Sequence, residues 1–263
     1  MLSLRALFDR FALPFFVASM YLFLYVPIIV LIIFSFNDSV SMFRWGGFSL
    51  RWYFEVFNDK TVWIALYNSL VVAFSSVALS LILGLFFVYY GSKTLKKILV
   101  LFYGALIVPE IVIAVGLLSL FSFLAVPLGF PTLIAGHTVL GLGYTVPILY
   151  ARYHELEYRL TEASLDLGAT VGQTFYKVIL PLLSPAMIAA GLLVFIISLD
   201  DFIVAFFCSS PSTETLPLYI FNVIRSGASQ MVSALSVILL MTGSLLVLIL
   251  SSLKIKKYFF FSD

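Results

Sequence analysis

Residues 62–90 read VWIALYNSLVVAFSSVALSLILGLFFVYY and contain no Asp, Glu, Lys or Arg. A helix needs about 20 apolar residues to cross roughly 30 Å of membrane hydrocarbon. Inside that layer the backbone groups must be hydrogen-bonded within the protein, so only helices and closed barrels can span it. The chain lacks the series of alternating segments of about ten residues that a barrel requires. This stretch therefore predicts a membrane-spanning helix.

Five further apolar stretches of comparable length lie on either side of this one. They cover residues 13–36, 98–126, 131–150, 186–207 and 232–253. The first is longer than the core of about 7–15 apolar residues in a signal peptide, so we expect it to be retained as a helix. The pattern predicts an all-α integral membrane protein with six transmembrane helices, in which residues 1–263 form a single membrane domain.

The overall composition agrees with a membrane protein and excludes several other classes. Of the residues, 62% are hydrophobic and 11% are charged, whereas soluble domains are roughly half apolar and a quarter charged. The net charge of +2 is small, and the basic residues lie in short clusters, which argues against nucleic-acid binding. Neither the single cysteine, Cys208, nor the two histidines belong to a metal-ligand cluster. No GxxxxGK[ST] phosphate loop occurs, so we do not expect the chain to hydrolyse ATP.

The distribution of Lys and Arg predicts the orientation, because cytoplasmic loops carry an excess of these residues. With the N-terminus inside, eleven lie on the inner side: Arg5, Arg10, Lys93, Lys96, Lys97, Arg152, Arg159, Lys177, Lys254, Lys256 and Lys257. Four lie outside: Arg44, Arg51, Lys60 and Arg225. Both termini are therefore predicted to be cytoplasmic. The aromatic-rich outer loop, residues 37–60, is predicted to lie at headgroup depth.

One inner connection, residues 151–185, is much longer than the others. Within it, residues 161–169 read TEASLDLGA and predict a short helix. Thr161 or a neighbour is expected to cap its start, and Glu162 to favour the positive end of the helix dipole. Gly168 is expected to end the helix in a left-handed conformation. A second helical stretch, residues 171–178, then runs into Leu180 and Pro181. On these grounds alone, an ordinary amphipathic surface helix between two spans fits equally well.

The spacing in this loop resembles a known family motif. Glu162-Ala163-Ser164, Gly168 and the pair Leu180-Pro181 are similar to the EAA loop of permease subunits in binding-protein-dependent ABC importers. Ser164 replaces the second alanine of the motif, and Val178 replaces an isoleucine. Further stretches, Pro-Glu-Ile-Val at 109–112, Ser-Leu-Asp-Asp at 198–201 and Thr-Leu-Pro-Leu at 215–218, resemble the second permease subunit of spermidine/putrescine importers. The resemblance covers nearly the whole chain.

The resemblance implies a type I ABC-importer permease fold and a set of partners. These are a homologous second permease, a dimer of ATPase subunits, an extracytoplasmic substrate-binding protein and the surrounding lipid. The chain itself would bind no cofactor, and the partner ATPase would use ATP and Mg²⁺. The implied ATPase-coupling residues are Glu162, Ala163, Ser164, Asp166, Gly168, Leu180 and Pro181.

Three acids, Glu110, Asp200 and Asp201, lie in apolar stretches and are the candidate substrate contacts. A carboxylate at the centre of a membrane helix costs about 2.5–3.5 kcal/mol, so it must pair, bind a proton or face water. Counting helical rise puts Glu110 and Asp200 in the outer half of the membrane, where a negative collar would attract a linear polyamine. Adjacent residues on a helix point about 100° apart, so the two aspartates cannot face the same point.

Alternatives remain open for these acids and for the function. The aspartates could form a structural ion pair or a solvated helix end, and Glu110 could satisfy carbonyls freed by Pro109. Cation–π contacts from Tyr89, Tyr90, Tyr103 or Tyr144 could add to a cation site. A permease for another small solute fits the same motif. An ion-gradient-driven transporter would predict repeated halves, and an intramembrane enzyme would need a nucleophile–base pair; the sequence shows neither.

Overall fold

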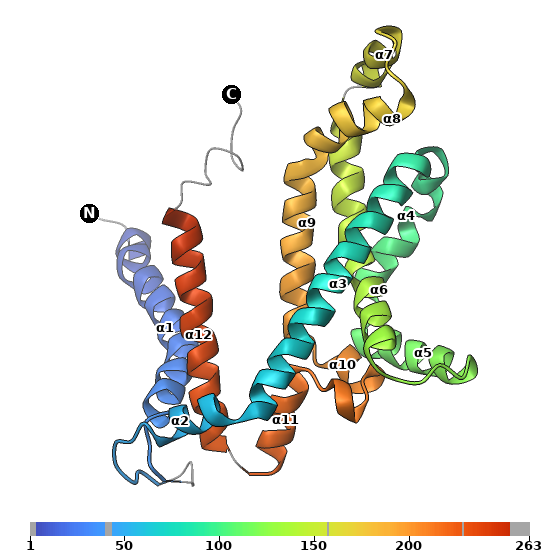
Figure 1. The fold of residues 1–263 in the computed structure, drawn as a ribbon. Coiled ribbons are helices and arrows are strands. Elements are labelled where there is room, and N and C mark those ends of the chain that lie inside the picture. Colours follow the sequence, from blue (N-terminus) through green and yellow to red (C-terminus); the bar gives the residue numbers. More distant parts are fainter. Residues whose placement is uncertain (1–3, 40–43, 157, 228, 253–263) are drawn as a thin grey trace. The chain divides into compact units, whose positions relative to one another are not determined.

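The structure is a computed structural model that describes residues 4–39, 44–156, 158–227 and 229–252. Those residues are helical, with no strand and one isolated β-bridge between Asn37 and Phe48. The elements, shown in Figure 1, are α1 (Leu4–Phe34), α2 (Arg51–Asn58), α3 (Lys60–Tyr90), α4 (Ser92–Ile107), α5 (Glu110–Phe123), α6 (Phe130–Glu155), α7 (Tyr158–Asp166), α8 (Val171–Thr174), the π-helical segment η1 (Phe175–Ile179), α9 (Leu180–Asp200), α10 (Ile203–Cys208), the 3₁₀ turn η2 (Pro211–Thr213), α11 (Leu216–Arg225) and α12 (Ser229–Ser252). The predicted all-helical class is confirmed.

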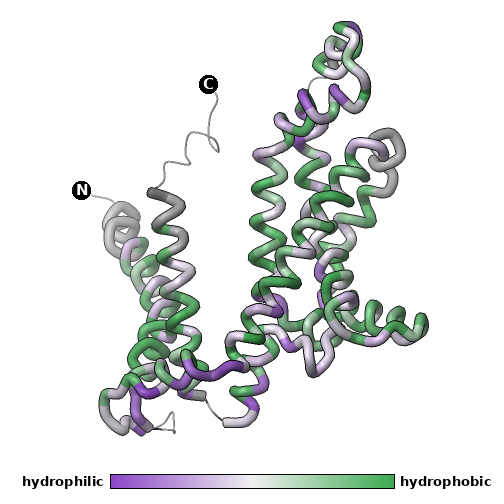
Figure 2. Tube along the Cα trace, in the orientation of Figure 1, coloured by the Kyte–Doolittle hydropathy of each residue, from purple (hydrophilic) through white to green (hydrophobic). Residues whose placement is uncertain are grey.

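Four helical runs in the described residues are long and apolar enough to cross a membrane. They are Leu13–Phe34, Lys60–Tyr90, Phe130–Glu155 and Val171–Asp200, and the count is five if α4 and α5 together form one span. Figure 2 shows that apolar residues dominate these helices. The predicted sixth stretch falls on α12, whose described apolar helix is Gln230–Leu245; residue 253 and Lys254, Lys256 and Lys257 lie outside the described residues.

The predicted span over residues 98–126 is wrong as a single helix. Helix α4 ends at Ile107, Val108 is extended with ψ 131°, and α5 begins at Glu110. The two helices are bent by 112° at this break. Pro109 explains the break, because it lacks a backbone N–H and disfavours a helical conformation in the residue before it.

The predicted span over residues 186–207 is also interrupted. Helix α9 ends at Asp200, Asp201 is extended with ψ 120°, and α10 begins at Ile203. The side chain of Asp201 accepts hydrogen bonds from backbone N–H groups at the start of α10. A carboxylate that caps the next helix in this way competes with continuation of the preceding one.

The described helices fall into two compact units. In the first unit, α1 and α12 lie side by side and run in opposite directions (Figure 1). Helix α2 packs on α12 and buries Trp52 and Val56. The indole Nε1 of Trp52 donates a 2.8 Å hydrogen bond to the carbonyl of Asn37, which fixes the loop that precedes α2.

In the second unit, α3, α6 and α9 cross closely at small residues. The hydroxyl groups of Ser76 and Ser80 donate 3.4 Å hydrogen bonds to the carbonyls of Ile134 and Thr138 on α6. A Cβ atom at Gly84 would come within 2.7 Å of Thr145 Cγ2. Small side chains permit such close approach between membrane helices, where hydrophobic association supplies no driving force.

Candidate functional site

The candidate coupling element, residues 158–174, comprises α7, the turn at Gly168 and α8, at one end of the second unit (Figure 1). Helix α7 begins at Tyr158, so Thr161 lies inside the helix and the predicted cap at that residue is wrong. Gly168 has φ +85°, as predicted for a left-handed terminus. Its N–H donates to the carbonyl of Leu165, and the N–H of Ala169 donates to that of Ser164. This is the Schellman pattern of a glycine-terminated helix.

Side-chain hydrogen bonds fix helix α8 at its start and at its last residue, Thr174. The Thr170 hydroxyl accepts from the N–H of Gln173 at 3.3 Å, and the Gln173 side chain accepts from the N–H of Thr170 at 2.9 Å. This reciprocal capping box satisfies two otherwise unpaired donors. The hydroxyl groups of Ser164 and Thr174 are 3.0 Å apart. The serine that departs from the family motif therefore joins α7 to α8.

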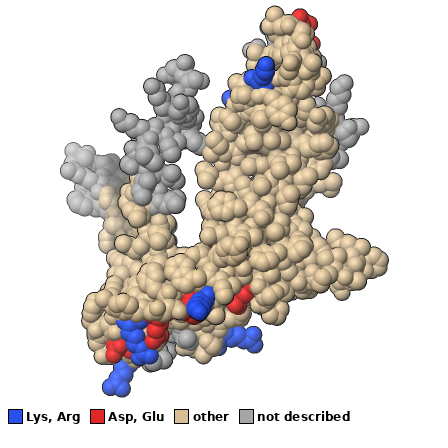
Figure 3. All heavy atoms as spheres, viewed as in Figure 1, with Lys and Arg blue, Asp and Glu red and all other residues tan. Residues whose placement is uncertain are grey.

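The predicted coupling residues divide into two groups. Glu162, Ala163, Asp166 and Gly168 are exposed on α7 and its terminal turn, and the neighbouring Leu167 is 88% exposed. Leu180 and Pro181 lie in the first turn of α9, beyond η1. Figure 3 shows charged side chains at this end of the molecule and an uncharged surface along the helices below it. The element thus offers an exposed surface with both acidic and apolar side chains.

Tyr89, at the end of α3, lies against this element. Its hydroxyl donates to the carbonyl of Val171 at 3.4 Å, and its ring centroid is 4.7 Å from that of Phe175. Tyr89 therefore contacts the segment that leads into α9, and a cation–π role for its ring stays a prediction. Sequence reasoning missed this contact, since Val171 and Phe175 are far from Tyr89 along the chain.

Asp201 is the centre of a second site, the acid–histidine cluster of Glu110, His137, Ser198 and Asp201. The carboxylate accepts backbone N–H groups from Ile203 (3.1 Å), Val204 (3.2 Å) and Ala205 (3.1 Å). His137 Nε2 on α6 lies 3.2 Å from its Oδ2 atom, and the Asp201 side chain is 1% exposed. The three backbone N–H groups give the buried carboxylate the donors that it needs in an apolar surrounding.

Glu110 is half-buried at the first position of α5, and α5 packs against α10, the helix that Asp201 precedes. Asp200, by contrast, is exposed at the last position of α9. The structure thus brings Glu110 and Asp201 together and turns Asp200 away from them.

His137 and Ser198 were not predicted as site residues. Ser198 Oγ lies 2.8 Å from His137 Nδ1, which completes a Ser–His–Asp series with Asp201. Nucleophilic catalysis requires that a substrate carbonyl reach the serine hydroxyl. Ser198 is only 6% exposed and His137 only 2% exposed, so the hydroxyl is closed to a substrate. The series instead joins α6, α9 and α10. Its sequence signal was a lone histidine in an apolar stretch and a serine one turn before Asp201.

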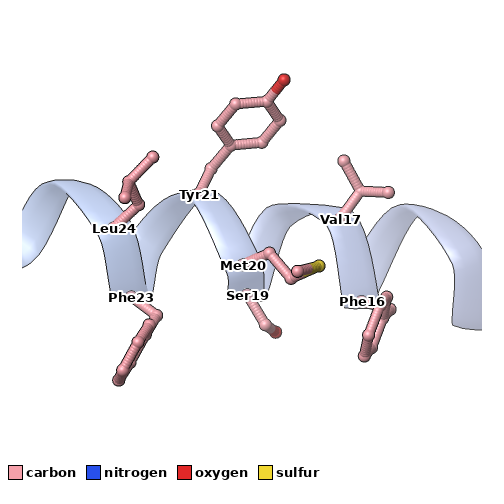
Figure 4. Close-up of a pocket in the computed structure, with 7 residues that line it drawn as sticks. All are labelled: Phe16, Val17, Ser19, Met20, Tyr21, Phe23 and Leu24. Carbon is pink, nitrogen blue, oxygen red and sulfur yellow. The ribbon is translucent and has the colours of Figure 1, made fainter. Parts of the chain in front are cut away.

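Neither metal ligands nor the hollow along α1 adds a binding site among the described residues. The described residues hold no group of three or more His, Cys, Asp or Glu side chains that could bind a metal ion. A hollow of about 570 Å³ lies along α1 and is lined by Phe16, Val17, Ser19, Met20, Tyr21, Phe23 and Leu24 (Figure 4). All seven come from one helix, and the Ser19 hydroxyl bonds to its own helix at the carbonyl of Phe15. This apolar surface has no feature that would bind a charged solute.

The helical fold, its exposed glycine-terminated loop and its apolar spans define a membrane-embedded transport subunit. Over residues 76–255 the chain matches the family described as the binding-protein-dependent transport system inner membrane component, and it belongs to that family. It is a multi-pass inner-membrane permease subunit of an ABC importer, and the ATPase is a separate subunit.

Relatives from two organisms extend the match to nearly the full length. The chain is 36% identical over 246 residues to the spermidine/putrescine transport system permease protein PotC of Haemophilus influenzae, covering 92% of this chain and 95% of that protein. It is 36% identical over 237 residues to PotC of Escherichia coli K12, covering 89% and 90%. It is 33% identical over 232 residues to the putrescine transport system permease protein PotI of Escherichia coli K12, covering 83% and 82%.

The fold is shared with a solved transporter. The crystal structure of a bacterial ABC transporter involved in the import of the acidic polysaccharide alginate matches 95% of this chain and 97% of its own chain, with a TM-score of 0.69 at 18% identity. At this identity the likeness concerns the fold alone. It supports the permease architecture for the described helices.

Proposed function

We propose that the chain is a permease subunit for polyamines such as spermidine and putrescine. The observation that carries this proposal is that PotC and PotI, polyamine permeases by name, match the chain over most of its length. The acids support it, since Glu110 is the only Asp, Glu, Lys or Arg between residues 98 and 151. A carboxyl group in such a stretch is costly unless it has a function or a partner. A permease for another small cation is the second candidate.

In this proposal the acids have different roles. Glu110, which is half-buried, and Asp200, which is exposed, contact the cationic substrate in the passage. Asp201 is held by three backbone N–H groups and His137, so it supports Glu110 rather than meeting the substrate itself. Coulomb attraction to carboxylates favours a protonated amine over a neutral solute, most strongly where water is excluded.

The proposed topology has six spans and cytoplasmic termini. The opposite directions of α1 and α12 support an even number of crossings. Counting α4 and α5 as one span and α12 as another gives the six stretches predicted from hydropathy. The distribution of Lys and Arg supports the inward orientation of the loop at residues 151–185. In this arrangement residues 1–263 form one transmembrane domain.

The remaining part of the proposal is that the candidate coupling element binds the ATPase. The partners are a dimer of ATPase subunits that uses ATP and Mg²⁺, a homologous second permease and an extracytoplasmic binding protein. Exposed Glu162, Ala163, Asp166 and Leu167 on α7 form the surface for the ATPase. Closure of the ATPase dimer would move this surface and switch the access of the passage, as in other two-state transport elements.

Uptake by the reconstituted complex tests the proposed substrate. The complex of this chain, its partner permease, the ATPase and the binding protein is placed in liposomes with internal ATP. Radiolabelled putrescine or spermidine should accumulate, and the accumulation should require both ATP and the binding protein. ATP-dependent uptake of a different solute, with no competition from either polyamine, would contradict polyamine as the substrate. It would leave the role of the chain as a permease subunit unchanged.

A further inference from the structure

Helix α3 is attached to the candidate coupling element at one end. The ring of Tyr89 packs on that of Phe175 in a tilted arrangement, with centroids 4.7 Å apart, and its hydroxyl donates to the carbonyl of Val171. Aromatic pairs at this separation attract each other beyond what the area they bury accounts for. Phe175 begins η1, and a π-helical segment inside a longer helix is frequently found at a functional site. The contact therefore joins α3 to the point where the coupling element becomes α9.

The other end of α3 is attached to the loop between η2 and α11. Asn68 Nδ2 donates a 2.9 Å hydrogen bond to the carbonyl of Glu214. The hydroxyl oxygen of Ser69 accepts a 2.8 Å hydrogen bond from the N–H of Leu216. Both side chains are buried, and leaving a buried polar group without a partner is costly, so these hydrogen bonds hold the loop against α3.

Between these two attachments α3 is an uninterrupted helix without proline. Helical rise makes the distance from residue 68 to residue 89 about 32 Å, comparable with the hydrocarbon thickness. Ser76 and Ser80 contact α6 along the middle of the helix. A straight helix that is fixed at both ends transmits a displacement, because packed helices shift as units rather than deform.

We propose that α3 links the coupling element to the loop at residues 209–215, and that Tyr89 is the positioning residue through which it does so. The inference rests on the proposed role of the coupling element in binding the ATPase. Movement of that element would reach the passage by two routes: along α9 to Asp200, and through Tyr89 along α3 to Glu214 and Leu216. The second route would let the ATPase control the loop that follows α10.

An ordinary interfacial tyrosine is the competing explanation, since tyrosines gather at membrane surfaces. Tyr90 supplies the comparison. This residue is 72% exposed, and its ring contacts those of Phe86 and Tyr89 in its own helix. Tyr89 differs because its hydroxyl donates to Val171 of the coupling element and its ring packs on Phe175 just after it, contacts that interfacial anchoring does not require.

A thiol reporter next to the attached loop tests the link. Ser212→Cys places the reporter at an exposed position two residues before Glu214, while the native Cys208 is buried; the chain without the reporter gives the background. Labelling by a water-soluble maleimide is measured in the assembled complex, without nucleotide and after trapping with ATP and vanadate. Trapping should change the labelling rate by about threefold or more. A change of this size is comparable with the coupling between distant sites that mutations are known to modulate.

The variants separate a link from a structural role. Tyr89→Leu should abolish the change in labelling while the complex keeps its ATPase subunits and basal hydrolysis. Tyr89→Phe should retain the change, since it keeps the ring, and so should the control Tyr90→Leu. Asn68→Ala should abolish the change from the other end, and combining it with Tyr89→Leu should add nothing. If Tyr89→Leu does not assemble, Phe175→Leu removes the same contact.

Either of two results would overturn the link: no change in labelling on trapping in the otherwise unaltered chain, or a full change in Tyr89→Leu and Phe175→Leu. Because the readout needs nucleotide but no substrate, failure of polyamine uptake would count against the proposed substrate alone. Failure of the coupling element as the ATPase site would appear separately, as full ATPase retention by Gly168→Val.

Discussion

The imidazole Nε2 of His137 lies 3.2 Å from the carboxylate Oδ2 of Asp201, while the adjacent Asp200 is exposed. Two neighbouring acids in one sequence motif therefore have opposite surroundings. Asp201 is buried at the junction of α6, α9 and α10, whereas Asp200 is accessible to a solute. This difference supports separate predictions for the two residues.

Asp201→Asn should destabilise the protein, and Asp200→Asn should not. The amide at residue 201 replaces an acceptor oxygen with a donor among backbone N–H groups, which should cost about 1–3 kcal/mol. The exposed residue 200 should stay within about 0.5 kcal/mol of the unaltered protein. Thermal unfolding of the two purified complexes measures the difference. Equal melting temperatures would show that Asp201 does not hold the helix junction.

Glu110→Gln should weaken the response to polyamine without loss of stability. The amide keeps the size and shape of the glutamate side chain, so the packing of α5 against α10 is kept. The charge available to a cation is lost, with an expected cost of about 1–3 kcal/mol in apparent affinity. Stimulation of ATP hydrolysis at increasing polyamine concentration measures the shift. An unaltered half-maximal concentration would remove Glu110 from the passage.

The Ser164–Thr174 hydrogen bond predicts a non-additive pair of substitutions. Ser164→Ala restores the alanine of the family motif but leaves the buried hydroxyl of Thr174, which is 1% exposed, without this partner. The expected loss is about 0.5–1.5 kcal/mol. Ser164→Ala combined with Thr174→Val should recover part of it, because neither group is then unpaired. Losses that simply add would show that the two hydroxyl groups are not coupled.

The chain purified without partners should hydrolyse no ATP, because its sequence contains no phosphate-binding loop. Phosphate release is measured with and without added ATPase subunit. Turnover by a preparation shown to be free of ATPase would contradict the division of labour between the two subunits.

The helices were predictable from the sequence because length and hydropathy define a membrane span almost independently of the fold. Gly168 was predictable for a similar local reason, since few other residues tolerate φ +85°. The breaks at Pro109 and Asp201 were missed, because hydropathy stays high across both. Recognising the second one requires knowing that the Asp201 carboxylate meets His137, 64 residues earlier in the chain (201 minus 137).

Tyr89 illustrates the limit of reasoning from residue type. A tyrosine at the end of a span suits an interface, a cation site or a helix contact equally well. Only the fold, which brings Val171 and Phe175 to it, reveals the helix contact. The same holds for Ser198, whose hydroxyl has a partner on α6 that no sequence spacing indicates.

The central claim is that residues 158–174 bind the ATPase, and Gly168→Val tests it most directly. A β-branched side chain at φ +85° is strained even where nothing lies within 4 Å. Gly172→Val is the matched control, since it also has open space but an ordinary helical conformation. Glu162→Lys supplies an independent change of charge on the exposed face of α7.

The measurement is the amount of ATPase retained by the purified complex, together with its substrate-stimulated hydrolysis. The account predicts that Gly168→Val and Glu162→Lys lose ATPase or lose stimulation, while Gly172→Val keeps both. A full ATPase complement and normal stimulation in Gly168→Val and Glu162→Lys would contradict the assignment of this element as the coupling site.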